Sequence, residues 1–387
     1  MISTDAWVLP RGPGGGTPPP RRSAALRRQI FHIPDLKEDE ALVEPLYGSW
    51  EANVDHALAR QPIDVCRQRG EDAVVVGNLG VVRVLQPDAA GTVRTGDVCM
   101  VMPFGRRDRH GYAELVYAYD MPGTYGLLAR RTKVAADLLL QVPDDPRYTL
   151  AQWATYARYF SAWDNWRVAF ASWRAQMSDA DPADHLVFGW GGGVALAELE
   201  LARRAGFRVA MTASSDDRLA YLAARGITPV DRRVFPDLAF DADRAVADQQ
   251  YADRYRASEK EFLRVLGELS DGTGAAIFVD NLGGSLIKPT LKAIARQGVL
   301  TTLGWKHGME IPMRRASECI RRHLHINTHV WRYQDSAQIR DYQLNTGWLP
   351  DPHTIEVRSF DEVPGLADDF AAGRTTSYFP LYRMEAP

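Results

Sequence analysis

The chain has 387 residues, of which 45% are apolar and 25% charged, and its formal net charge at neutral pH is -3. This length and apolar content are enough for two globular domains, and the lack of a basic surplus argues against nucleic acid or an anionic membrane as a partner. No apolar run is long enough to cross a membrane, and the N-terminus lacks the apolar core of a signal peptide. The three cysteines are widely separated and odd in number, which suits a reducing cytoplasm and excludes a four-cysteine zinc lobe.

Residues 1 to 28 are predicted to form a flexible tail. The segment from Pro10 to Arg22 is rich in proline, glycine and arginine, a composition that cannot bury a core. An alternative is that its arginines close over an anionic ligand, but a solvated tail is the preferred interpretation.

Short apolar runs separated by turn residues predict a mostly β first domain over residues 29–160. Residues 73–84 are typical of two strands joined at a glycine corner, and residues 95–102 of a turn that enters the next strand. This pattern fits a small β-barrel. Aromatic residues spaced three and four apart over 149–177 then predict a helix at the domain boundary, either a hinge or a wall against which a substrate stacks.

A glycine-rich turn is the centre of the second domain, predicted over residues 161–344. The apolar run 185–190 leads into the glycines, a helical segment follows as far as Gly206, and a second strand covers residues 207–212. This order begins a βαβ unit, in which glycines let the backbone approach a pyrophosphate at the helix N-terminus. The spacing is G-x-x-G-G-x-A, not G-x-G-x-x-G. The residues expected at the cofactor are Gly189, Gly192, Gly193, Val194 and Ala195.

The end of the second strand bears on the choice of cofactor. Ser214 and Ser215 can donate hydrogen bonds to a 2′-phosphate, and Arg218 can form a forked ion pair with it, which favours NADPH. Asp216 and Asp217 keep NADH as an alternative, because either carboxylate can bind a ribose or cap a helix.

The parallel sheet is predicted to resume at 275–284, 297–304 and 324–330, after a helical or irregular insertion at 231–262. From about residue 345 the chain returns to complete the first domain.

Several of these segments resemble the medium-chain dehydrogenase/reductase superfamily: G-N-x-G-V and G-D-V in the β-rich domain, the G-x-x-G-G-x-A turn, and the later D-N-x-G-G and L-G-W. Residues 125–134, the insertion and residues 321–329 are similar to the crotonyl-CoA carboxylase/reductase branch and to quinone and enoyl reductases. The resemblance implies an α/β protein with a GroES-like β-barrel domain and a Rossmann domain with a doubly wound parallel sheet. It also implies an NADPH-dependent oxidoreductase that dimerises through residues 299–330 at the sheet edge.

Two departures from the family bear on the chemistry. Zinc members carry C-x-x-D followed by G-H-E, whereas the matching segments here are 52–55 and 77–79, which lack the cysteine, histidine and glutamate. No metal is therefore expected, and a carbon-carbon double bond conjugated to a carbonyl becomes the natural hydride acceptor. Carboxylating members carry a Glu-His pair where this chain has Asp280 and Asn281, so carboxylation is not expected.

The resemblance also implies the residues around the substrate. Asn53, Asp55 and His56 match a loop on which related reductases place an Asn or Tyr, and a histidine suits general acid work at neutral pH. A structural role for His56 is the alternative. Asp120 matches a position near the family's active-site Glu. The residues implied near the nicotinamide are Ser161, Asn281 and Gly304. His307 matches a loop that lines the cofactor in the family, with a surface role as the alternative.

The chain is therefore predicted to be a zinc-independent, NADPH-dependent reductase. Its substrate would be a small molecule, an enone or an α,β-unsaturated thioester of CoA or a carrier protein, reduced without carboxylation. An alternative is a zinc-free alcohol or sugar dehydrogenase that acts on a polar carbonyl through a relay of Asp55 and His56. A second alternative is a catalytically silent partner protein that binds NADPH.

Overall fold

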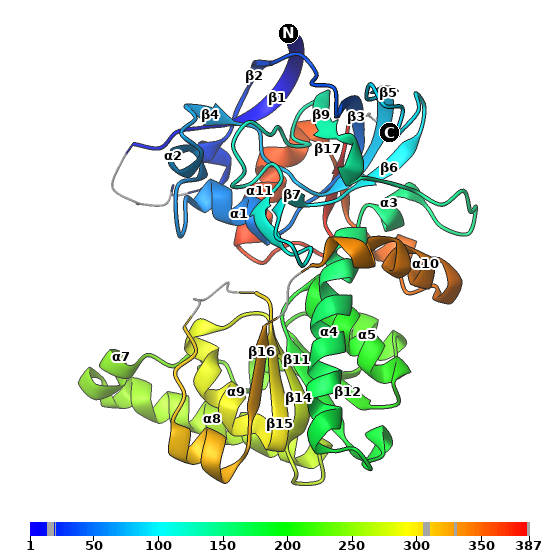
Figure 1. The fold of residues 1–387 in the computed structure, drawn as a ribbon. Coiled ribbons are helices and arrows are strands. Elements are labelled where there is room, and N and C mark those ends of the chain that lie inside the picture. The colour runs from blue at the N-terminus through cyan, green and yellow to red at the C-terminus, as the bar shows by residue number, and fades with distance from the viewer. Residues whose placement is uncertain (14–18, 20, 305–309, 329–330, 385–387) are drawn as a thin grey trace. The chain divides into compact units, whose positions relative to one another are not determined.

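The computed structural model describes residues 1–13, 19, 21–304, 310–328 and 331–384. The chain divides into two compact units (Figure 1). Unit 1 consists of Met1–Phe160 together with Trp331–Pro387, and unit 2 of Ser161–Val330. Residues 331–344, predicted to belong to the nucleotide domain, lie in unit 1. There the carbonyl of Ser336 accepts a hydrogen bond from Tyr156 Oη at 2.7 Å.

Unit 1 is built on β-strands that are mainly antiparallel. Its largest sheet has the order β10-β6-β5-β3-β18-β17, with β9 also paired to β3. The strands are β3 (Glu40–Ser49), β5 (Gly80–Gln86), β6 (Val98–Val101), β9 (Thr132–Ala135), β10 (Leu139–Gln141), β17 (Val357–Ser359) and β18 (Leu381–Arg383). A separate pair joins β7 (Phe104–Arg107) to β8 (Ala113–Val116). Because β18 pairs with β3, the end of the chain completes the sheet that begins near residue 40.

The start of the chain is a strand, so the prediction of a tail was wrong for residues 1–10. β1 (Ile2–Pro10) pairs antiparallel with β2 (Arg27–Ile33) and with β4 (Ala73–Val74). Alternate positions along β1 point inward, among them Ala6 at 0% exposed and Val8 at 1%. The proline- and glycine-rich composition belongs only to the residues after Pro10, and the period-two pattern before it is that of a half-buried strand.

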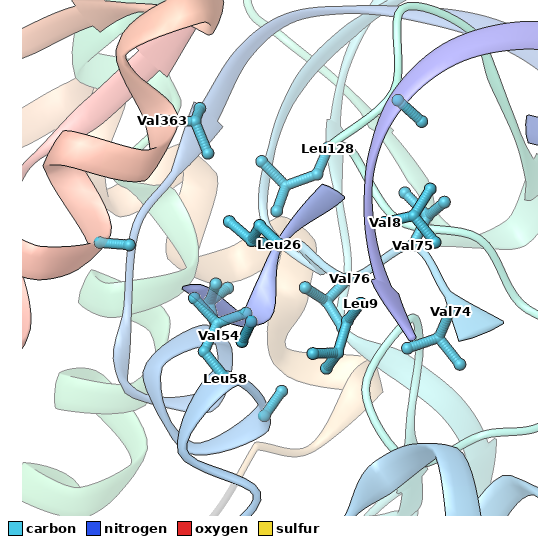
Figure 2. Close-up of a cluster of buried hydrophobic side chains, with 14 of the residues drawn as sticks. Val8, Leu9, Leu26, Val54, Leu58, Val74, Val75, Val76, Leu128 and Val363 are labelled. Carbon is cyan, nitrogen blue, oxygen red and sulfur yellow. The ribbon is translucent and has the colours of Figure 1, made fainter. Parts of the chain in front are cut away.

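A buried apolar cluster anchors the first helix of unit 1, α1 (Ala52–Ala59) (Figure 2). Val54 and Leu58 of α1 are 2% and 0% exposed, and side chains of this size contribute about 1.5–3 kcal/mol each when fully buried. Their labelled neighbours in the cluster are Val8, Leu9, Leu26, Val74, Val75, Val76, Leu128 and Val363. The remaining helices of unit 1 are α2 (Val65–Arg69), α3 (Leu150–Trp153), α10 (Ser336–Thr346) and α11 (Val363–Ala371). The cluster fixes α1, which carries three of the predicted catalytic residues.

Unit 2 is a parallel six-stranded sheet with helices (Figure 1). The strand order is β13-β12-β11-β14-β15-β16, and every neighbouring pair is parallel. The strands are β11 (Leu186–Trp190), β12 (Arg208–Ala213), β13 (Thr228–Asp231), β14 (Ala275–Asp280), β15 (Ile294–Thr302) and β16 (His325–Thr328). Counted within the unit, the order is 3-2-1-4-5-6, which is that of the Rossmann fold.

The helices of unit 2 connect these strands. They are α4 (Tyr156–Gln176), which starts in unit 1, α5 (Gly193–Arg204), α6 (Asp216–Ala224), α7 (Ala242–Ala247), α8 (Gln249–Leu269) and α9 (Ile287–Ala293). The insertion predicted at 231–262 contains α7 and most of α8, and Phe262 of α8 is fully buried in the core cluster of this unit. No helix among the described residues combines the length and the apolar content that a membrane span needs.

Candidate functional site

The glycine-rich turn joins β11 to α5. Gly191 has a φ of 143°, which residues with a side chain rarely adopt, and a Cβ at this position would lie 3.1 Å from the Cβ atoms of both Ala195 and Asn281. A Cβ on Gly192 would meet nothing within 4 Å. Gly191 therefore makes the turn, and Gly192 leaves open space beside it. The predicted motif omitted Gly191, although the spacing of Gly189 and Gly191 was a signal for it.

The N-terminus of α5 opens onto this space. Gly192 is the N-cap residue and offers no side-chain cap, and the first intrahelical bond runs from the N–H of Leu196 to the carbonyl of Gly192. The N–H groups of Gly193, Val194 and Ala195 precede that bond, so they have no acceptor within the helix. Free N–H groups and the positive end of the helix dipole favour an anion such as a pyrophosphate.

Close packing of α5 on the sheet holds the turn in place. A Cβ on Gly189 would lie 3.2 Å from Cδ1 of Leu199, and Ala195 is 0% exposed. Small residues at these two positions let helix and strand approach each other, as the motif predicts. Gly191 and the residues of the predicted motif thus lie in one turn or directly beside it.

Hydroxyl and cationic side chains follow β12 at its carboxyl end. Ser215 caps α6, since its Oγ accepts a hydrogen bond from the N–H of Arg218 at 3.4 Å, and Ser214 is exposed. Asp216 forms an ion pair with Arg233 at 2.6 Å. Because a cation already engages Asp216, that carboxylate is a weaker candidate for a ribose ligand.

Asn281 follows β14 directly and joins three elements. Its Oδ1 accepts hydrogen bonds from the backbone N–H of Leu303 at 2.9 Å and of Gly304 at 3.4 Å, and its Nδ2 donates to Glu198 of α5 at 3.3 Å. A Cβ on Gly304 would lie 2.2 Å from the carbonyl oxygen of Asn281, so only glycine fits there without a shift. Together with Gly191, these residues cluster at the carboxyl ends of β11, β14 and β15, where the strand order reverses and α/β proteins bind ligands.

Glu198 is a residue that the sequence analysis missed. It is 0% exposed, and Nδ2 of Asn165 on α4 donates a second hydrogen bond to it at 3.0 Å. Burial raises the pKa of Glu198 to about 8, against the effect of the two amide donors. A glutamate at an inward position of the helix that follows the glycines was the available signal. Ser161, which precedes Asn165 by one helical turn on α4, is 4% exposed.

In unit 1, α1 carries Asn53, Asp55 and His56. Asp55 forms an ion pair with Arg22 at 2.8 Å, and both side chains are more than three-quarters buried. His56 is 9% exposed, which favours the structural role that the sequence left as its alternative. Asp55 is therefore already bound by a cation from the segment that was predicted to be a tail.

Glu51, the N-cap residue of α1, and Arg158 form a second group of polar side chains. Oε2 of Glu51 accepts the N–H of Asn53 at 2.9 Å, while its Oε1 is buried without a partner. The charge of Arg158 acts on Glu51, yet among the described contacts no ion pair joins the two side chains. Burial raises the pKa of Glu51, and the bond from Asn53 and the charge of Arg158 lower it by less.

Arg158 is 7% exposed, and only one of its guanidinium nitrogens donates a hydrogen bond to a protein acceptor. Nη1 donates to the carbonyl of Tyr378 at 2.8 Å, whereas Nε and Nη2 are buried without a partner. These two nitrogens form the edge of the guanidinium that presents two parallel N–H groups to a carboxylate or carbonyl oxygen. Burial lowers the pKa of Arg158 to about 10, so it remains a cation at neutral pH.

Asp120 lies in the loop after β8. Its Oδ1 accepts the N–H of Val116 at 2.6 Å, and burial raises its pKa. Burial also raises the pKa of Tyr119, and the charges of Glu51 and Asp120 add to that shift. The charges of Asp120 and of Glu51, the N-cap residue of α1, thus both act on Tyr119.

The segments that match zinc ligands in the family hold no ligand cluster. Among the residues that the structure describes, no group of three or more His, Cys, Asp and Glu side chains is arranged to hold a metal ion. Asn78 is 1% exposed, and its Nδ2 is buried without a partner. His307 lies outside the described residues.

No protein-family model matches the chain, and no curated protein matches it by sequence. Solved structures are similar to it over its whole length. The crotonyl-CoA carboxylase/reductase AntE in complex with NADP is 18% identical, with a TM-score of 0.76 over 98% of this chain and 94% of that one. The 2-octenoyl-CoA carboxylase reductase CinF in complex with NADP and 2-octenoyl-CoA is 17% identical, with a TM-score of 0.76 over 100% and 88%. An alcohol dehydrogenase from the archaeon Aeropyrum pernix is 15% identical, with a TM-score of 0.73 over 98% and 99%.

These likenesses concern the fold. Both of the predicted architectures are present: a β-rich unit 1 and a unit 2 with the Rossmann strand order. The resemblance read from the sequence is therefore confirmed at the level of the fold, and the chain has the two-part α/β fold of the medium-chain dehydrogenase/reductases.

Proposed function

We propose that the protein is a zinc-independent, NADPH-dependent reductase that transfers a hydride to an α,β-unsaturated acyl thioester or enone without carboxylating it. The observation that carries this proposal is the glycine turn at the point where the sheet order reverses. There the N-terminus of α5 has no side-chain cap, and the space beside Gly192 is open. This arrangement fits the pyrophosphate of a dinucleotide.

The choice of NADPH rests on the end of β12. Ser214, Ser215 and Arg218 supply the hydroxyl and cationic groups that a 2′-phosphate needs, and Asp216 is paired with Arg233. Two neighbours in fold, AntE and CinF, are crystallised with NADP. When bound, NADPH supplies the hydride at its nicotinamide ring. The backbone N–H groups from Gly193 to Ala195 would hold the pyrophosphate, and Ser161, Asn281 and Gly304 remain the residues proposed near the nicotinamide.

The chemistry at the substrate needs hydrogen-bond donors in place of a Lewis acid. Arg158 meets this need, because its Nε and Nη2 are buried donors that lack an acceptor. A carbonyl oxygen that gains negative charge during reduction would accept both bonds. Glu51 is a candidate for proton delivery, because burial raises its pKa and the charge of Arg158 acts on it. Asn53 and Asp120 stay candidates for orienting the substrate, while Asp55 and His56 are weaker ones.

The surroundings of Asp280 and Asn281 support reduction without carboxylation. Asp280 is fully buried and accepts hydrogen bonds from the N–H groups of Leu282 and Gly283 and from Oγ1 of Thr290. The amide of Asn281 is likewise bound on both sides. Both side chains are therefore engaged by groups of the protein itself.

The proposal is tested by following NADPH oxidation, with NADH in parallel, when purified protein receives a short 2-enoyl-CoA with and without bicarbonate. We expect NADPH consumption and only the saturated acyl product. A carboxylated product would overturn the interpretation of Asn281.

Cofactor binding without turnover would favour the second function, a dehydrogenase that acts on a polar carbonyl. This function would be tested next with alcohols and sugars. That candidate is supported by the fold likeness to the Aeropyrum pernix alcohol dehydrogenase. Failure of all these substrates would leave the silent NADPH-binding partner.

We also propose that the protein forms a homodimer through the edge of its parallel sheet. β16 is the last strand in the sheet order, and it lies within the predicted range 299–330. Sedimentation equilibrium would show a mass of about twice 43.2 kDa if this is right.

A further inference from the structure

A buried polar network lies below the glycine turn of unit 2. Asn165 of α4 and Asn281 after β14 each donate an amide hydrogen bond to Glu198 of α5, at 3.0 and 3.3 Å. Glu198 is 0% exposed, and so is Asn165. A carboxyl group placed so deeply, with no cation bound to it among the residues that the structure describes, is costly to retain, so this position calls for an explanation.

The orientation of the Asn281 amide follows from its partners. Its Oδ1 receives the backbone N–H groups of Leu303 and Gly304, so its Nδ2 must face Glu198. Glu198 is therefore the acceptor that completes the bonding of Asn281. Asn281 in turn holds the backbone that follows β15.

The other end of the network can adopt two arrangements. Oδ1 of Asn165 is buried without a partner, while its Nδ2 donates to Glu198. An ionised Glu198 accepts from both amides. A neutral Glu198 has a proton to donate, and a turned Asn165 amide offers Oδ1 to accept it. In both arrangements Asn281 keeps its bond, because the backbone donors determine its orientation.

We propose that Glu198 is a positioning residue of the dinucleotide site, which acts through Asn281 to hold the backbone at Leu303 and Gly304 and thereby sets the affinity for NADPH. This inference rests on the proposed function, since it assumes that the cofactor binds where the sheet order reverses. Asn281 lies there, as its Cβ is the atom that a side chain on Gly191 would meet.

The same geometry predicts how the site responds to pH. Charged groups on the elements packed against α5 have partners other than Glu198. On α4, Asp164 pairs with Arg167, Arg158 donates to the carbonyl of Tyr378 and Arg174 to that of Ala180. Arg208 of β12 pairs with Asp271, and Asp280 of β14 accepts N–H groups. β11 carries no ionisable residue. Glu198 therefore ionises near pH 8, where burial has raised its pKa, and its charge then disfavours the anionic cofactor. NADPH affinity should fall as the pH rises through 8.

The test compares NADPH binding, followed by fluorescence, from pH 6.5 to 9.5 in the wild type and in E198Q, E198L and E200Q. Glutamine can accept from Asn281 and donate to Asn165, so E198Q should bind NADPH as the wild type does at pH 7. The wild type should lose about fivefold in affinity between pH 7 and 9, and E198Q should lose almost none. Glu200, a buried carboxylate on the same helix that pairs with Arg225, is the matched control, and E200Q should keep the wild-type pH profile.

Hydrogen exchange without cofactor provides a second measurement. E198L removes the acceptor of Asn281, so the amides of Leu303 and Gly304 should exchange at least tenfold faster than in the wild type or in E200Q. Unchanged exchange, or a pH profile that E198Q shares with the wild type, would overturn the inference. No NADPH binding by the wild type at any pH would instead overturn the proposed function, and the exchange result would still decide whether Glu198 positions this backbone. If E198L does not fold, the pH profile of E198Q decides alone.

Discussion

The two units hold their candidate sites in different ways. In unit 2 the site consists largely of backbone groups: the turn at Gly191, the open space at Gly192 and the N–H groups that begin α5. In unit 1 it consists of side chains from distant parts of the chain, since Arg158 binds the carbonyl of Tyr378, 220 residues away. A backbone site depends on a few glycines and on one helix start. A side-chain site depends on how the whole unit packs.

The largest expected effect comes from the glycine turn. Gly191→Val would place a branched side chain at a φ of 143° and against Ala195 and Asn281. We expect NADPH affinity to fall at least about 100-fold, since strain at such a position costs about 1–3 kcal/mol before the clashes are added. Fluorescence titration measures it. Gly267→Ala on α8, where a Cβ meets nothing within 4 Å, is the control, and unchanged affinity in Gly191→Val would contradict the backbone site.

The side-chain site of unit 1 is tested at Arg158. Arg158→Met should lower kcat about 100-fold, because a removed donor to a developing oxyanion costs that much, while NADPH affinity stays unchanged. Arg158→Lys keeps the charge but not the two parallel N–H groups, so it should recover little of the rate. Steady-state kinetics with a 2-enoyl-CoA that the wild type reduces would show this. Full activity in Arg158→Met would remove Arg158 from the proposed mechanism, and thermal unfolding controls for misfolding.

A smaller effect is expected at the end of β12. Arg218→Ala should reduce the preference for NADPH over NADH by about tenfold, because one charge-assisted contact to the 2′-phosphate is lost. NADH affinity should not change. The matched control is Arg256→Ala on α8, an exposed arginine paired with Asp253. An equal loss for both cofactors would mean that Arg218 acts on the structure and not on the phosphate.

The smallest effect concerns the segment that was predicted to be a tail. Arg22→Ala breaks the ion pair with Asp55 and should lower the free energy of unfolding by about 1 kcal/mol. Arg11→Ala breaks an exposed pair with Asp72 and should cost less. Urea unfolding compares the two variants. A loss of NADPH affinity in Arg22→Ala would mean that this ion pair of unit 1 also affects the cofactor site of unit 2.

Local patterns explain why unit 2 was the easier part to predict. A strand, a glycine cluster, a helix and a second strand follow one another within about thirty residues, and the glycines act through their own backbone. Gly191 was missed because the motif was read in a different spacing. Glu198 was missed because its inward position on the helix was a weak signal, and only the tertiary structure shows its partners Asn165 and Asn281.

Unit 1 was harder for a related reason. The tail prediction extended a composition found after Pro10 to the strand before it. Glu51 and Arg158 lie in segments with no motif, so nothing local marked them. Asp55 and His56 were chosen from the resemblance, and the structure places one in an ion pair and buries the other.

The sequence by itself determined the fold class and the glycine turn, because both depend on patterns of neighbouring residues along the chain. Only the tertiary structure decided which polar side chains share a buried site. The charge of Arg158 acts on Glu51, and Asn165 and Asn281 donate hydrogen bonds to Glu198. Both groups form because elements far apart in sequence pack together. Burial then raises the pKa of both carboxyl groups, an effect of surroundings that no local pattern records.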